Sequence, residues 1–121
     1  MSAPITFREL LSRYQAGERD FAGSELDEDP DGDLAGLCLD GIDLSCSYVI
    51  AGFRGASLRG ARFHNANLKT CEFDDADLTG ADFTEAALCA TSFKGARLDG
   101  ARFEGAYYHS HTLAAGEVPD W

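Results

Sequence analysis

Long apolar stretches are missing from this sequence. No run approaches the ~20 residues that a membrane-spanning helix requires, and no charged segment followed by an apolar one precedes residue 20. We therefore expect a chain that neither crosses a membrane nor is exported, and we predict a cytoplasmic location.

Cysteine is scarce, and its spacing excludes the common thiol motifs. The four cysteines include no C-x-x-C pair, which excludes a zinc ribbon and a thioredoxin-like redox motif. Reduced thiols of a cytoplasmic protein are the simpler interpretation. From their places in the repeat described below, we predict that Cys46 and Cys71 are buried, whereas Cys38 and Cys89 face outward.

Basic residues are also few. The chain has 10 lysines and arginines against 21 aspartates and glutamates, which gives a formal net charge of −11. Such an excess of acids argues against non-specific binding to nucleic acid or to anionic lipid. The sequence has no nucleophile elbow, P-loop or dinucleotide-binding fingerprint. We therefore expect no catalytic residues, no cofactor and no enzymatic activity.

What the sequence does contain is a five-residue repeat. From Cys46 to Ser110 the chain divides into thirteen consecutive units, of which ten begin with Ala and six end with Gly. Their third residues are all large and apolar or aromatic, and we predict that they form the core: Tyr48, Phe53, Leu58, Phe63, Leu68, Phe73, Leu78, Phe83, Leu88, Phe93, Leu98, Phe103 and Tyr108. Earlier units, centred on Phe21, Leu26, Leu34, Leu39 and Leu44, keep the register with slips, including a one-residue deletion that we place before Tyr48.

A period of five fits neither an α-helix nor a plain β-strand. It fits a short extended stretch followed by a tight corner. A type II turn at each corner would need a positive φ at the fifth residue of the unit, where Gly costs least and Asn or Asp next. The six glycines, with Asn65 and Asp75 at the same position, obey this requirement.

The run resembles the pentapeptide-repeat family, whose unit is written A-(D/N)-L-x-x. Ala76–Gly80 (ADLTG) and Ala66–Thr70 (ANLKT) are close to that consensus. The resemblance implies an all-β fold, a right-handed quadrilateral parallel β-helix with four units to a coil. The chain would then be a single domain, 1–121, with four to five coils in 18–110, an acidic loop near 27–31 and a C-terminal tail in 111–121.

Four units per coil would place residues twenty apart directly above one another. Phe53, Phe73 and Phe93 then form one core column, and Phe63, Phe83 and Phe103 form the opposite one. Leu58, Leu78 and Leu98 form a third column, and Tyr48, Leu68, Leu88 and Tyr108 form the fourth. A narrow four-sided tube favours stacking of identical side chains in adjacent coils.

The two ends of such a tube need covers. Ile5, Phe7, Leu10, Leu11 and Tyr14 recur at near-helical spacing, which predicts a short amphipathic α-helix that caps the N-terminal end within 1–17. The tail at 111–121 offers Leu113, Val118 and Trp121, either as a second lid or as a docking surface for another copy.

Acidic and basic residues alternate in bands along the chain, and this arrangement has two interpretations. Charges twenty residues apart alternate in sign, as in Arg54, Asp74 and Lys94, and opposite charges in adjacent coils would fix their register. The acidic band also supplies the candidate partner-facing acids: Glu72, Asp74, Asp75, Asp77, Asp82 and Glu85.

The function predicted from these features is a non-catalytic protein-interaction module. Its partner is an unidentified protein, with no nucleic acid and no membrane, and the chain is a monomer or an end-to-end homodimer. An alternative follows from resemblance to quinolone-resistance pentapeptide proteins, which implies an acidic mimic of DNA that binds a type II topoisomerase (gyrase). A structural or stress-tolerance protein without a dedicated ligand is the third hypothesis.

No metal site is expected. Asp27, Asp29, Asp31 and Asp33 match the first half of an EF-hand calcium loop and are candidate ligands, but the twelfth position is Cys38 rather than Glu. His109 and His111 form an H-x-H pair without an evident third ligand. We interpret the aspartates as a solvated acidic loop and the histidines as surface residues.

Overall fold

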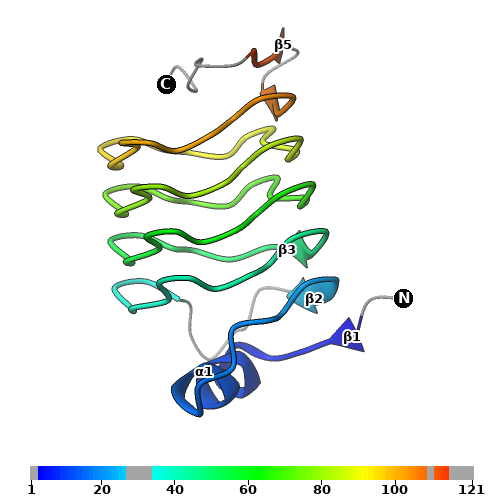
Figure 1. Cartoon of the computed structure of the whole chain (residues 1–121), viewed down its shortest axis with the longest axis vertical. Helices are drawn as coiled ribbons and strands as arrows, with labels where there is room; N and C mark the ends of the chain where they lie inside the picture. Colours follow the sequence, from blue (N-terminus) through cyan, green and yellow to red (C-terminus); the bar gives the residue numbers. More distant parts are fainter. Residues whose placement is uncertain (1–2, 27–33, 109–110, 115–121) are drawn as a thin grey trace.

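The computed structural model describes residues 3–26, 34–108 and 111–114. The regular elements are short: β1 (Ala3–Pro4), α1 (Phe7–Gln15), β2 (Ser24–Leu26), β3 (Tyr48–Val49), β4 (Tyr107–Tyr108) and β5 (His111–Thr112). Figure 1 shows similar coils stacked along the long axis of the molecule, with α1 at the N-terminal end. The acidic loop with Asp27, Asp29, Asp31 and Asp33, and also His109, Val118 and Trp121, lie outside the described residues.

Parallel pairing joins each coil to the next. Strands β1, β2 and β3 pair in that order, and isolated bridges continue the pairing along the tube. From Gly52 to Tyr107 each bridge joins residues twenty positions apart, as in Arg62 with Asp82. The predicted four-sided parallel β-helix, with four units to a coil, is therefore confirmed.

Two phenylalanine columns fill the centre of the tube. The rings of Phe63 and Phe83 stack with their centroids 5.0 Å apart, and those of Phe83 and Phe103 are also 5.0 Å apart. The other column repeats this arrangement, with 5.0 Å between Phe53 and Phe73. Rings of the two columns meet edge to face, a favourable geometry for aromatic pairs. The predicted alignment of residues twenty apart is confirmed.

The corners have the predicted backbone. In the corner after Phe73, the amide of Ala76 donates to the carbonyl of Phe73 at 3.0 Å, and Asp75 takes a φ of 59°. Glycines occupy most of these positions, but Thr70, Glu85 and Ala90 also have positive φ. A left-handed conformation costs a residue other than glycine about 1–2 kcal/mol.

Replacing Ala90 with glycine should therefore stabilise the protein. Ala90 is exposed and has a φ of 60°, so the change relieves backbone strain without opening a cavity. The greater freedom of glycine in the unfolded chain offsets part of this gain, and we expect a net increase of about 0.5–1 kcal/mol in the free energy of unfolding. The matched control is Ala86→Gly at a buried position, which should lower stability; a loss of stability from both changes would contradict the argument.

The sequence-based register is wrong between Leu44 and Phe53. The predicted core residue Tyr48 is 44% exposed, and Val49 is buried instead. Val49 follows Leu44 by five residues and precedes Phe53 by four, so the deletion lies after Val49 rather than before Tyr48. A tyrosine pointing inward would need a partner for its hydroxyl, whereas Val49 fits above Leu26, its parallel partner.

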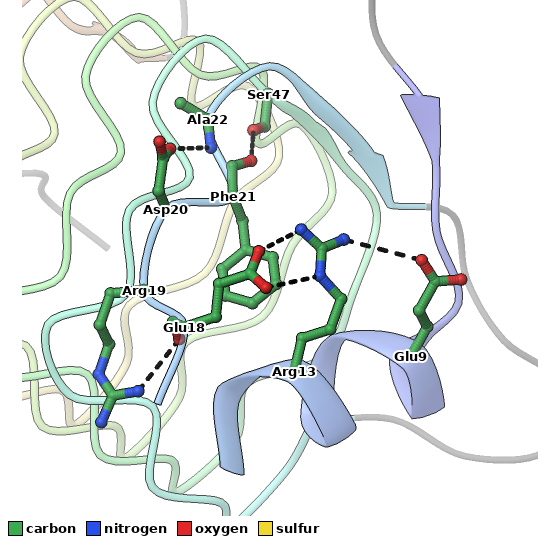
Figure 2. Close-up of polar contacts among 8 residues, drawn as sticks. All are labelled: Glu9, Arg13, Glu18, Arg19, Asp20, Phe21, Ala22 and Ser47. Atoms are coloured by element: carbon green, nitrogen blue, oxygen red, sulfur yellow. Dashed lines mark hydrogen bonds and ion pairs between the residues drawn. The ribbon is translucent and has the colours of Figure 1, made fainter. Parts of the chain in front are cut away.

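Because of the same one-residue shift in register, the prediction that Cys46 is buried is wrong. Cys46 is exposed at a corner with a φ of 60°, and Ser47 takes the inward position that the sequence analysis gave to Cys46. The Ser47 hydroxyl donates to the carbonyl of Phe21 at 3.2 Å, as Figure 2 shows. A small hydroxyl at this position connects two coils, which explains why serine is accommodated inside the tube.

Helix α1 lies against the first coil. Thr6 caps it by accepting a hydrogen bond from the amide of Glu9, and Phe7 and Leu10 are buried. The Arg13 guanidinium lies 4.9 Å from the centroid of the Phe21 ring. Glu9 and Glu18 hold this guanidinium by ion pairs (Figure 2). Arg13 thus places a charged, hydrogen-bonded group over the aromatic residue at the N-terminal end of one column.

The last described coil is less completely covered. Leu98, predicted as core, is only partly buried, as are Ala96 and Ala101. No further coil of the described chain stacks on them. Leu113 is 4% exposed, and it pairs through its backbone with Gly105 and Ala106.

Candidate interaction surface

Each side of the tube presents one outward-pointing residue per coil, directly before the core side chain. These residues form four central columns, because they pair from coil to coil. The columns are Gly52, Glu72 and Ser92; Cys38, Ser57, Asp77 and Arg97; Asp20, Asp43, Arg62, Asp82 and Arg102; and Glu25, Tyr48, Asn67, Ala87 and Tyr107. The corners between the sides carry the remaining exposed residues.

Basic and acidic bands pair across adjacent coils. Arg54 lies 3.0 Å from a carboxylate oxygen of Glu72 and 3.5 Å from one of Asp74. Arg59 similarly faces Asp77 at 3.7 Å. Exposed ion pairs of this kind contribute only about 0–1 kcal/mol each. Their main effect is to favour one register of the coils.

Two of the six candidate acids accept hydrogen bonds from threonines in their own corners. The backbone amide and the hydroxyl of Thr79 both donate to Asp77, at 3.1 and 2.6 Å. Thr84 donates in the same way to Asp82, at 2.9 and 2.6 Å. Hydrogen bonding to Thr79 is the main reason that the pKa of Asp77 lies below its ordinary value. Partial burial alone would raise the pKa of Asp82, but the Thr84 hydrogen bonds and the nearby Arg102 and His64 lower it.

These two carboxylates should make the protein less stable in acid. Their folded pKa values lie below the ordinary value of 3.8, so their contribution is present above that pH and is lost as the pH falls through the folded pKa. The double variant Asp77→Asn, Asp82→Asn should therefore lose less stability than the wild type between pH 7 and about pH 3. Urea unfolding at both pH values measures this difference; equal losses in the two proteins would contradict it.

The candidate partner-facing acids do not form one row. Glu72, Asp75 and Glu85 are exposed, whereas Asp74, Asp77 and Asp82 are half-buried. The six residues follow one coil around three of its sides, so they form a partial ring about the tube. One oxygen of Asp74 is buried without a hydrogen-bond partner among the described residues, and it is therefore not displayed to a partner.

One side of the tube differs from the others. The part of its central column that we call the tyrosine side consists of Tyr48, Asn67, Ala87 and Tyr107, which are all uncharged; Glu25 continues the column below Tyr48. Both tyrosines are 44% exposed, and they are the exposed large hydrophobic residues of the described chain. Within residues 48–107, each of the other three central columns includes at least one acid. Sequence reasoning missed this surface because it placed Tyr48 in the core.

The described thiols and imidazoles lie in different environments. Cys71 is buried as predicted, and burial raises the pKa of its thiol to about 12. Cys38 is exposed and Cys89 is partly exposed. His64 Nδ1 lies 2.7 Å from the Thr84 hydroxyl. Among the described residues, no group of three or more His, Cys, Asp or Glu side chains could hold a metal ion.

Comparison with known proteins identifies the family. A family model described as pentapeptide repeats matches residues 51–73 and 71–107, with eight copies. A pentapeptide repeat protein of known crystal structure from Nostoc Pcc 7120 is 30% identical over 97% of this chain and 93% of its own, with a TM-score of 0.48. The chain belongs to the pentapeptide-repeat family. Its tube is therefore the right-handed quadrilateral β-helix of that family.

Two other solved structures match smaller shares of this chain. A pentapeptide repeat protein from the Arabidopsis thaliana thylakoid lumen is 32% identical over 61% of this chain and 63% of its own, with a TM-score of 0.34. A plasmid-mediated fluoroquinolone resistance protein is 17% identical over 78% of this chain and 67% of its own, with a TM-score of 0.40. No protein with a curated description matches this pentapeptide-repeat sequence. No helix in the described residues is both long and apolar enough to span a membrane.

Proposed function

We propose that this pentapeptide-repeat protein is a non-catalytic module that binds a protein partner. The observation that carries the proposal is the tyrosine side, where two half-exposed tyrosines share one column with the uncharged Asn67 and Ala87 between them. Tyrosine is over-represented among the residues that dominate protein interfaces. It provides a large contact area at a low cost in side-chain entropy.

The rigidity of the tube supports this function. Stacked rings at 5.0–5.3 Å occupy its centre, and parallel pairing fixes the spacing of the outward residues at about 4.8 Å per coil. A partner would therefore meet Tyr48 and Tyr107 already held in place. Such preorganisation lowers the entropy cost of binding.

A photo-crosslinking side chain at position 107 tests the proposal in cells. We expect a reproducible protein adduct when benzoylphenylalanine replaces Tyr107, and a much weaker adduct when Tyr48→Ser is also present. The control position is Arg97, which is the central residue on another side of the same coil region. The same adducts from both positions, or no adduct from either, would refute a specific interaction on the tyrosine side.

The alternative, a DNA mimic that binds gyrase, rests on the net charge of −11. The contacts of the acidic band weigh against it, because Arg54 faces Glu72 and Asp74 while threonines bind Asp77 and Asp82. A duplex instead presents its phosphates in continuous rows. Inhibition of gyrase supercoiling by micromolar protein, lost in the Asp77→Asn, Asp82→Asn variant, would favour mimicry over our proposal. The cytoplasmic location is also a proposal, with which the four free cysteines agree.

A further inference from the structure

Two Asp–Gly steps of the described chain lie in the same corner of the tube, in different coils. Asp40–Gly41 and Asp99–Gly100 both follow a leucine and occupy the fourth and fifth positions of their units. Arg59–Gly60 and Thr79–Gly80 stand between them in that corner. The φ of Gly41 is 74° and that of Gly100 is 72°. The two Asp–Gly steps therefore share their local sequence and their backbone geometry, and they differ in their surroundings.

An Asp–Gly step can rearrange its main chain without an enzyme. The backbone nitrogen of the glycine attacks the side-chain carboxyl carbon of the aspartate, and glycine has no side chain to hinder the approach. A new C–N bond closes a five-membered succinimide ring, while the amide hydrogen and one carboxyl oxygen leave as water. Water then opens the ring at either carbonyl. One opening restores aspartate, and the other gives isoaspartate, whose main chain runs through the former side chain.

Hydrogen bonds hold the corner at Asp40 at each group that must move in this reaction. The Asp40 carboxylate accepts from the Ser57 hydroxyl at 2.6 Å and from the Arg59 amide at 2.9 Å. The Gly41 amide, which contains the attacking nitrogen, donates to the Arg59 carbonyl at 2.9 Å. The Tyr14 hydroxyl donates to the Asp40 carbonyl at 2.7 Å. Ring closure would have to break these contacts together, so the fold protects this step.

Fewer hydrogen bonds hold the corner at Asp99. Asp99 and Gly100 are both exposed. Within the described parts of the chain, no group donates to the Asp99 carboxylate and none accepts from the Gly100 amide. The corner keeps the hydrogen bond from the Ala101 amide to the Leu98 carbonyl at 3.0 Å, and the Gly80 amide donates to the Asp99 carbonyl at 2.8 Å. The two groups that react are thus not held by any described neighbour.

We propose that Asp99–Gly100 is a site of spontaneous isoaspartate formation in the folded protein. The corner must open locally before the Gly100 nitrogen can reach the carboxyl carbon, and local opening is easiest where few contacts hold the backbone. Leu98, the residue before the step, is only partly buried. The step lies in the corner between the columns of Arg97 and Arg102, away from the tyrosine side, so the modification is independent of the proposed binding function.

Isoaspartate at this corner should loosen the pairing of the last coil. It adds one carbon atom to the main chain and displaces the Asp99 carbonyl, which accepts from the Gly80 amide. We expect the Gly80 amide to exchange its hydrogen faster in the isomerised protein. The matched control is the Gly60 amide, which donates to the Thr79 carbonyl at 2.9 Å and should keep its exchange rate. Nuclear magnetic resonance measures both amides in one sample.

Ageing the full chain near neutral pH in water enriched in heavy oxygen tests the proposal. Each opening of the ring leaves one heavy oxygen atom in the residue, and electron-transfer fragmentation of proteolytic peptides locates the label and the isoaspartate. We expect both at position 99 to exceed those at position 40 at least about tenfold. In concentrated urea the two positions should differ by about twofold or less, because the protecting contacts are then lost. The remaining Asp–Gly step, Asp31–Gly32, lies outside the described residues, and the same fragmentation distinguishes it from the other two.

Two variants check the cause of the difference. Asp99→Glu should abolish the label at position 99, because the corresponding ring would have one more member and closes far more slowly. Ser57→Ala should raise the conversion of Asp40, because it removes a hydrogen bond from that carboxylate. Equal conversion of Asp40 and Asp99 in the folded protein would overturn the proposal. So would an unmodified Asp99 in folded protein whose urea-unfolded form converts at both positions.

Discussion

Phe83→Ala should remove about 3–5 kcal/mol of the free energy of unfolding. Phe83 is fully buried. Its ring stacks on those of Phe63 and Phe103, each 5.0 Å away, and meets those of Phe73 and Phe93 edge to face at 5.5 Å. Truncation leaves a cavity in the middle of the tube that stacked neighbours on both sides cannot fill. The loss is a large fraction of the 5–15 kcal/mol that stabilises a typical domain.

Urea unfolding followed by circular dichroism measures this effect. Phe83→Leu is the matched control, because leucine already fills two other columns of the tube and should cost about 1.5 kcal/mol or less. Phe103→Ala should also cost less than Phe83→Ala, since Phe103 has a stacked neighbour on one side only in the described chain. An unchanged midpoint for Phe83→Ala would show that the ring column does not hold the coils together.

A mid-tube cavity should also reduce cooperativity. In a solenoid each coil contacts only its neighbours, so stability is close to a sum of coil and interface terms. Phe83 belongs to a central coil, and its loss weakens the interfaces on both sides. We therefore expect a broader transition for Phe83→Ala than for a change at either end of the tube.

Much of this fold follows from local pattern. The alternation of Phe and Leu every five residues predicts the columns, because a four-unit coil places Phe63, Phe83 and Phe103 on one side. Glycine at the fifth position predicts the corners, and positive φ at Gly80 and Gly100 agrees. These features repeat many times, so a single exception does not obscure them.

The register near Tyr48 could not be obtained in this way. Phe53 follows Leu44 by nine positions. This interval is one five-residue step and one four-residue step, and the shorter step can come either before or after the core residue between them. Tyr48 and Val49 are both apolar enough to be that residue. The structure resolves the choice through long-range contacts, since Val49 pairs with Leu26 and Ser47 donates to the carbonyl of Phe21. Neither contact is visible in the repeat itself.

The candidate surface depended on the same ambiguity. With Tyr48 assigned to the core, the repeat offers no pair of outward aromatic residues in one column, and the acids are then the candidate surface. The structure places half of those acids in partly buried positions. A useful sequence signal would have been the uncharged second positions of the units at Asn67, Ala87 and Tyr107. This signal occurs only once in every four units, so it does not stand out along the sequence.

A matched pair of lysine substitutions separates the two registers. Val49→Lys should prevent folding, because it forces an unpaired charge into a closed stack between Leu26 and Leu68, at a cost of several kcal/mol. Tyr48→Lys should change the free energy of unfolding by about 0.5 kcal/mol or less, as expected for an exposed position. Soluble yield and the thermal transition by circular dichroism measure both. If Tyr48→Lys failed to fold while Val49→Lys melted like the wild type, the register with Tyr48 inside would be correct, and the tyrosine side would lose one of its two anchors.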